Sequence, residues 1–138
     1  MHDERDTEWV QPARRRILIA ASDHRVRDAL RAVLEADGRH VVVGEACTAP
    51  GLSALDQALQ PELVLLDVLF PTAADGLDVI RRLARGNQRP VVALSARAGL
   101  RAAALAVGAA AFVEQGVGAD ELLGVVHAVV GRGAPSGS

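Results

Sequence analysis

A carboxylate, a hydroxyl and an amide each follow an apolar run of the sequence, and these three groups are the candidates for chemistry. Asp67 ends the stretch ELVLLD, Ser95 ends VVALS, and Gln115 comes directly after AAFVE. Apolar runs of this length indicate strands that are buried on both faces of a parallel sheet. Because a charge is costly inside a core, we expect Asp67 where its strand emerges, at the carboxyl edge of the sheet. Open parallel sheets bind ligands and carry out chemistry at that edge.

Five strand–helix units are expected to position these residues. The strands are predicted at residues 17–21, 41–45, 62–67, 91–95 and 110–113. The helices are predicted at residues 24–36, 52–59, 76–86, 99–107 and 119–130. Ser22 or Asp23 is expected to cap the first helix, while residues 48–51 and 70–75 are expected to form a turn and a loop. The alternation predicts an α/β fold with one parallel sheet, right-handed crossovers and helices on both faces.

The composition and charge exclude several classes of function. The chain has 138 residues, enough for one domain with a full core, and its net charge of −2 gives no electrostatic reason to bind nucleic acid or an anionic membrane. All 15 basic residues are Arg, so chemistry that needs a lysine is excluded. The single Cys47, the charged N-terminus and the lack of any apolar run of about 18 residues favour a cytoplasmic protein. Residues 1–13 are predicted to be a flexible tail, 14–131 the folded domain and 132–138 a linker-like end.

Other catalytic or metal sites are not indicated by the sequence. No predicted strand is followed by a glycine-rich phosphate loop or a GxGxxG turn. No serine lies in a nucleophile elbow. The histidines do not have the spacing of metal ligands and are scattered along the chain, at His2, His24, His40 and His127. An independent enzyme is therefore not expected.

From Ile17 to Val130 the chain resembles a receiver domain of bacterial two-component response regulators, of the type joined to a LuxR/NarL-like DNA-binding domain. The resemblance is carried by the order and spacing of several blocks, which are ILIAASDHRVRDALRAVLEADG, VVVGEA, PELVLLDVLFP, DGLDVIRRL, PVVALSA and GAAAFVEQG. It implies the flavodoxin-like strand order 2-1-3-4-5. It also implies that Asp67 is the phosphoryl acceptor, Ser95 the switch hydroxyl and Phe112 the switch aromatic.

The sequence departs from the pattern of this family around the acceptor. Receivers carry an acidic pair after the first strand that holds Mg²⁺, and in this chain the pair falls on Ala21 and Ser22, with Asp23 one place too late. The family's lysine after the fifth strand falls on Gln115. By this resemblance a metal site would have to consist of Asp67, Asp23 and the backbone carbonyl of Leu69.

These departures predict weak or absent Mg²⁺ binding and slow phosphorylation or none. Phosphoryl transfer depends on cations that neutralise the phosphoryl oxygens, and Mg²⁺ prefers several oxygen ligands that include carboxylates. The amide of Gln115 donates hydrogen bonds but brings no charge. Arg97, two places after Ser95, is a candidate to swing over Asp67 and pair with it; the alternative is a solvated arginine at the start of a helix.

Three functional hypotheses follow. The first is an atypical receiver, or pseudo-receiver, that acts in transcription regulation through protein contacts. It would dimerise through the fourth helix, fifth strand and fifth helix, receive its signal from a sensor histidine kinase, and make no direct contact with nucleic acid. The second is an ordinary phosphorylatable receiver that uses Asp23 and Asp67 for Mg²⁺. The third is a small-molecule-binding α/β regulatory module.

Overall fold

The computed structural model describes residues 13–133 and contains the predicted α/β fold. Its five parallel strands lie in the order β2-β1-β3-β4-β5, which confirms the order that the family resemblance implied. The strands are β1 Arg15–Ala20, β2 His40–Ala46, β3 Leu63–Asp67, β4 Val91–Ser95 and β5 Ala111–Glu114. The helical segments are α2 His24–Asp37, α3 Ala49–Leu59, α4 Ala73–Arg81, the π-helical η1 Arg82–Gly86, the 3₁₀-helical η2 Ala98–Leu100, α5 Arg101–Ala106 and α6 Ala119–Gly133.

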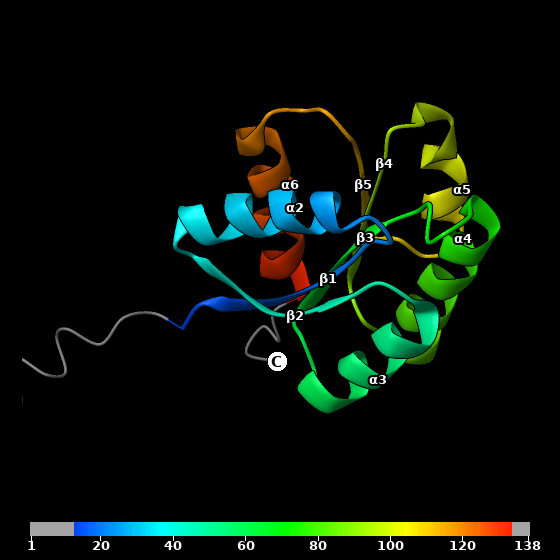
Figure 1. Cartoon of the computed structure of the whole chain (residues 1–138), viewed down its shortest axis with the longest axis horizontal. Coiled ribbons are helices and arrows are strands. Elements are labelled where there is room, and N and C mark those ends of the chain that lie inside the picture. The colour runs from blue at the N-terminus through cyan, green and yellow to red at the C-terminus, as the bar shows by residue number, and fades with distance from the viewer. Residues whose placement is uncertain (1–12, 134–138) are drawn as a thin grey trace, which may run out of the picture.

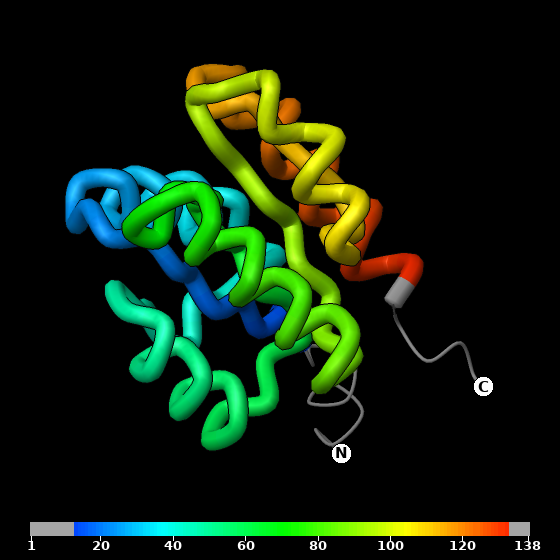
Figure 2. Tube along the Cα trace, turned by 90° about the vertical axis from the view of Figure 1, so that its right-hand side faces the viewer, coloured from blue at the N-terminus to red at the C-terminus, as the bar shows by residue number. Residues whose placement is uncertain are grey.

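Two apolar layers cover the sheet, one on each face. Alternate residues of the central strands point to opposite faces, so Ile17 and Ile19 pack on one side and Leu18 and Ala20 on the other. Figure 1 shows α2 and α6 together on one side of the sheet, with α3, α4 and α5 on the other. Seen from the side of the latter group, α4 lies between α3 and α5 (Figure 2). The middle strand β3 is buried along its whole length, as the run ELVLLD predicted.

Two helices begin earlier than expected because threonine side chains cap them. Thr48 Oγ1 accepts a hydrogen bond from Gly51 N at 3.1 Å, and α3 starts at Ala49 rather than at residue 52. Thr72 Oγ1 accepts from Asp75 N at 3.1 Å, and α4 starts at Ala73 rather than at Gly76. The predicted turn and loop at these places were therefore wrong in part: each contains an N-cap threonine followed by the first helical turn.

The other boundaries are close to those predicted. Asp23, one of the two residues expected to do so, is the N-cap of α2, and Gly38 ends that helix in the left-handed region at φ 83°. Helix α6 continues to Gly133, three residues beyond its expected end. The predicted tail at residues 1–13 lies outside the described residues except for Ala13, as do residues 134–138 of the linker-like end. Within residues 13–133, no helix is both long enough and apolar enough to cross a membrane.

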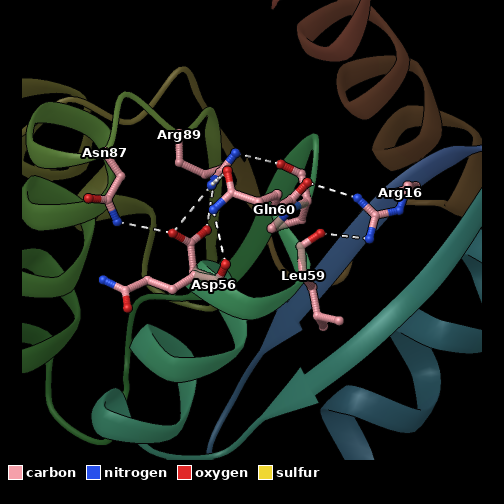
Figure 3. Close-up of polar contacts among 8 residues, drawn as sticks. Arg16, Asp56, Leu59, Gln60, Asn87 and Arg89 are labelled. Carbon is pink, nitrogen blue, oxygen red and sulfur yellow. Dashed lines mark hydrogen bonds and ion pairs between the residues drawn. The ribbon is translucent and has the colours of Figure 1, made fainter.

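A buried ion pair ties the amino ends of the strands together (Figure 3). The carboxylate of Asp56 on α3, only 1% exposed, accepts from Arg89 Nε at 2.7 Å and from Asn87 Nδ2 at 3.0 Å. Arg89 also donates to the carbonyl of Pro61, directly before β3. Arg16 at the start of β1 donates to two carbonyls at the end of α3. These contacts join α3, β1, β3 and the segment before β4 at the edge opposite to Asp67.

Candidate functional site

Asp67 lies at the carboxyl edge of the sheet, at the end of β3, and is only 8% exposed. Its Oδ1 atom accepts a hydrogen bond from the backbone N–H of Leu69 at 3.1 Å. Burial raises the pKa of Asp67 above its ordinary value, the Leu69 hydrogen bond lowers it, and the negative charge of Asp23 raises it again. The site therefore holds a desolvated carboxylate with a second carboxylate close enough to act on its charge.

The segment after Asp67 is held tightly against the start of α4. Val68 and Phe70 are fully buried in the layer under α3, α4 and α5, and Val68 N donates to Leu94 O at 2.9 Å. Gly76 approaches the backbone of Val68 so closely that a Cβ atom at Gly76 would lie 1.7 Å from the Val68 carbonyl oxygen. Because the buried side chains of Val68 and Phe70 fix the backbone on either side of Leu69, the N–H of Leu69 is held in its direction toward Asp67.

Two arginines of α2 organise the loop after β1. Arg25 donates to Asp23 from its backbone N at 2.9 Å, from Nε at 3.3 Å and from Nη2 at 3.1 Å. These bonds from Arg25 hold the pKa of Asp23 below its ordinary value. Arg27 Nη1 donates to the carbonyls of Ala21 at 2.7 Å and Ser22 at 3.2 Å, the two positions on which the family resemblance placed the acidic pair. The loop is thus fixed by guanidinium groups.

Ser95 and Gln115 meet at the neighbouring strand ends. Ser95 is fully buried, and its Oγ accepts from Arg97 N at 3.0 Å. Gln115 N donates to Ser95 O at 2.8 Å, while the side chain of Gln115 is exposed. The guanidinium of Arg97 is exposed and makes no hydrogen bond or ion pair with Asp67 or any other described residue. Of the two alternatives for Arg97, the structure has the solvated arginine.

Phe112 points into the core on the α5 side of the sheet and is almost completely buried. The guanidinium carbon of Arg101, the first residue of α5, lies 5.0 Å from the centroid of the Phe112 ring. Arg101 Nη1 also donates to the carbonyl of Phe112, at 3.4 Å. A guanidinium over an aromatic face is an attractive cation–π contact. Arg101 therefore joins α5 to the ring that the family resemblance implied as the switch aromatic.

The residues at this edge do not form a complete Mg²⁺ site. Within residues 13–133, no group of three or more His, Cys, Asp or Glu side chains is arranged to hold a metal ion. The carboxylates at this edge are Asp67 and Asp23, whose negative charge raises the pKa of Asp67, and both oxygens of Asp23 are already bonded to Arg25. Mg²⁺ requires nearly octahedral oxygen coordination, which this pair does not supply. No step involving a bound cation follows from this arrangement.

Sequence reasoning missed four residues that shape the site: Arg25, Arg27, Gly76 and Arg101. For Arg25 a local signal existed, because an arginine two places after an N-cap carboxylate can reach back to it. The same spacing recurs at Asp37 and Arg39, where Arg39 donates to the carboxylate at 2.8 and 3.1 Å. For Arg101 and Gly76 no local signal existed, since their partners Phe112 and Val68 are reached only through the fold.

The fold and the buried carboxylate at the sheet edge agree with a comparison to known families. Residues 17–127 match the response regulator receiver domain, and the chain belongs to this family. It is accordingly a receiver of two-component signalling. Receivers of this family generally are not enzymes; they bind Mg²⁺, interact with histidine kinases and can dimerise.

Individual relatives support the same assignment. The chain is 34% identical to Response regulator MprA from Mycobacterium sp. (strain KMS), over 87% of this chain and 52% of that protein. The chain therefore spans about half the length of the curated relatives it matches. The NarL signal receiver domain from Mycobacterium tuberculosis is 26% identical and superposes with a TM-score of 0.78, covering 87% of this chain and 98% of that one. A LuxR-family response regulator from Aurantimonas sp. SI85-9A1, 20% identical with a TM-score of 0.79, covers 87% of each chain and shows the shared fold.

Proposed function

We propose that this chain is an atypical receiver that regulates through protein contacts, with weak or absent Mg²⁺-dependent phosphorylation at Asp67. The observation that carries the proposal is the charge distribution at the sheet edge. The negative charge of a second carboxylate, Asp23, raises the pKa of Asp67, the oxygens of Asp23 are bonded to Arg25, and the exposed Gln115 stands where the lysine is expected. Asp67 has the position of a phosphoryl acceptor, but it lacks the neighbouring cations that would neutralise the phosphoryl oxygens during transfer.

The assigned roles follow from the chemistry of phosphoryl transfer. A carboxylate oxygen of Asp67 would form a bond to the donor's phosphorus while the bond to the leaving group breaks. The negative charge on the phosphoryl oxygens must then be matched by nearby donors. Leu69 N–H, the Ser95 hydroxyl and the neutral amide of Gln115 supply donors, but none supplies a charge. We therefore assign Asp67 as a slow acceptor, Ser95 as the switch hydroxyl and Phe112 as the switch aromatic.

A phosphate-mimic titration tests this proposal. We expect no saturable binding of beryllofluoride at millimolar Mg²⁺ when the amides of Leu69 and Arg97 are followed by NMR. The matched control is Asp67→Asn, which keeps the size of the side chain and removes its charge. Saturable binding in the natural chain that disappears in Asp67→Asn would overturn the proposal in favour of an ordinary receiver that uses Asp23 and Asp67 for Mg²⁺.

The proposed output is dimerisation through the face formed by α5, β5 and α6, with a sensor histidine kinase as the source of the signal. Supporting this face, Leu105 on α5 is 42% exposed, the only large apolar side chain so exposed in the described part of the chain. Arg101 links the same helix to Phe112. Analytical ultracentrifugation of the natural chain and of Leu105→Glu checks the proposal. A loss of dimer in the variant supports it, and identical sedimentation counts against it.

A second candidate function, binding of a small molecule, is favoured by one cavity. A depression of about 440 Å³ lies among the loops that follow β1, β2 and β3. Its lining combines apolar and hydroxyl side chains, such as Phe70 and Thr48, with the charged side chains of Asp75, Asp78 and Arg82. Open α/β sheets bind ligands beside the carboxyl ends of their strands. A thermal-shift screen with metabolites tests this candidate, and a flat response to all of them rejects it.

A further inference from the structure

A mostly apolar cavity of about 180 Å³ lies between α2 and α6, at the carboxyl ends of β4 and β5. Leu94 of β4 and Val113 of β5, both almost completely buried, form its floor. The two helices that flank it lie on the same side of the sheet (Figure 1). The cavity shares no lining residue with the depression among the loops after β1, β2 and β3. It is therefore a separate candidate site.

The cavity exists because small residues line it where larger side chains would fill it. The stripe of α2 that lines it runs at helical spacing from Val26 to Val33, and Ala29 within this stripe contributes only a methyl group. Gly116 and Ala119 belong to the opposite wall, before and at the start of α6. A Cβ atom at Gly116 would meet nothing within 4 Å, so this part of the wall borders open space.

The volume and the lining of the cavity define the chemistry of its ligand. An apolar cavity of about 150 Å³ is sufficient to bind benzene, whereas pockets for drug-sized molecules have about 300–1,000 Å³. A cavity of about 180 Å³ therefore accommodates a single six-membered ring. The polar residues of the lining, Glu114 and Gln115, are both exposed, so they lie where the cavity opens to solvent. Because a buried charge without a partner is costly, the apolar interior favours a neutral ring.

We propose that this cavity is a binding site for a neutral apolar molecule with a single six-membered ring. The site goes beyond the proposed function, because it does not depend on phosphorylation of Asp67. It is nevertheless connected to the switch hydroxyl. Gln115, which lines the cavity, donates from its backbone N to Ser95 O at 2.8 Å, and Ser95 Oγ accepts from Arg97 N at 3.0 Å. Occupation of the cavity should therefore be detected at the Arg97 amide.

The experiment is a titration of the natural chain with benzene, followed by NMR. We expect saturable shifts of the methyl groups of Val26, Val33 and Val117, which line the cavity, and a smaller shift of the Arg97 amide. Benzoate has the same ring and carries a carboxylate. It should bind at least about tenfold more weakly than benzene, because its charge would enter an apolar interior without a partner.

Three alanine-to-leucine variants locate the binding site. Ala29→Leu fills the cavity from α2 and should weaken benzene binding about tenfold, because the ligand loses contacts equivalent to about two CH₂ groups. Ala119→Leu fills the cavity from α6 and should have the same effect, so the result does not depend on one variant. The matched control is Ala102→Leu, at an exposed position of α5 on the other side of the sheet, and it should retain the affinity of the natural chain.

Several results would overturn the proposal. The absence of saturable shifts up to the solubility limit of benzene would reject the site. Equal binding of benzoate, or equal weakening in Ala102→Leu, would show nonspecific association. A largest shift at the methyl groups of Val79 would place benzene in the depression after β1, β2 and β3 instead.

Occupation by a second copy of the chain is also distinguished. Shifts of the Val26 and Val117 methyl groups that grow with protein concentration in the absence of benzene would mean that a side chain of another copy fills the cavity, and they would reject a small-molecule site. None of these results affects the proposed function, which is tested separately by the phosphate mimic at Asp67.

Discussion

Replacing Gly76 by alanine should destabilise the protein, although most helical positions gain stability from this change. A Cβ atom at Gly76 would lie 1.7 Å from the carbonyl oxygen of Val68 and 2.6 Å from its carbonyl carbon. Both atoms belong to the backbone directly after Asp67, so no side-chain rotation relieves the overlap. Overpacking typically costs about 1–3 kcal/mol, and the upper end applies where backbone must move. Alanine stabilises a helix by about 1 kcal/mol relative to glycine, so the free energy of unfolding should fall by about 2 kcal/mol in total.

The matched control for this prediction is Gly124→Ala on α6. Gly124 lies in a helix interior and is exposed, and a Cβ atom there would meet nothing within 4 Å beyond its own helix backbone and chain neighbours. Only the helical preference acts there, and Gly124→Ala should gain about 0.5–1 kcal/mol. Urea unfolding followed by circular dichroism measures both variants. Equal stability of Gly76→Ala and the natural chain would refute the close approach of α4 to the backbone that follows β3.

Three further substitutions have defined outcomes. Arg89→Met should lower the free energy of unfolding in urea by about 3–5 kcal/mol, because it leaves the buried Asp56 carboxylate without its cation. Substitution of the exposed Arg85 by Met should change this free energy by under about 0.5 kcal/mol. Equal losses in the two variants would contradict a structural role for the buried pair. Burial lowers the pKa of His40, so the natural chain should lose stability as the pH falls below 6.5. His40→Leu should flatten that slope, while substitution of the exposed His24 by Gln should retain it. The pKa of Asp67 is raised in the folded state, so its contribution to stability is most favourable at low pH and falls as the pH rises from 3.8 through the folded pKa. Asp67→Asn should therefore be more stable than the natural chain at neutral pH. A less stable Asp67→Asn would show that the carboxylate has a stabilising partner.

The pH dependence assigned to His40 has a geometric basis. His40 is fully buried, and Asp37 Oδ2 lies 3.1 Å from its Nδ1 atom. Neither ring nitrogen has an aligned hydrogen bond to a described residue, so the contact with Asp37 is a close approach and not a directed bond. Asp37 raises the pKa, while the positive charges of Arg39 and His127 lower it, and burial is the largest effect. Protonation in the folded state is therefore disfavoured.

The helix boundaries show where local reasoning succeeded and where it fell short. Strand β4 has the predicted bounds because the apolar run between Pro90 and Ser95 is short and leaves few other places where a strand could begin or end. The starts of α3 and α4 were missed because the apolar pattern begins several residues after the cap. The signals were present in both cases, as a threonine three places before Gly51 and before Asp75. The capping residue therefore marks the start of each helix better than its first apolar position does.

The sequence alone determined the fold and the place of Asp67, because both depend on periodicity. Five apolar runs alternating with helical segments leave few topologies, and a carboxylate at the end of a fully buried run has to emerge at the sheet edge. The strand order also followed, through the family resemblance, and the structure confirms it. The family resemblance also predicts from the sequence that Ala21 and Ser22 stand at the places of the acidic pair and Gln115 at the place of the lysine.

Only the tertiary structure decided how the groups around Asp67 are paired. Asp23 follows β1 and its carboxylate is bonded to Arg25, while Arg97 remains in solvent instead of covering Asp67. The contact of Gly76 with Val68 also depends on the final packing of α4 against the sheet. Periodicity fixes which residues reach an edge, whereas the partner of each charge depends on side-chain rotamers and on distances between loops that are brought together only by folding.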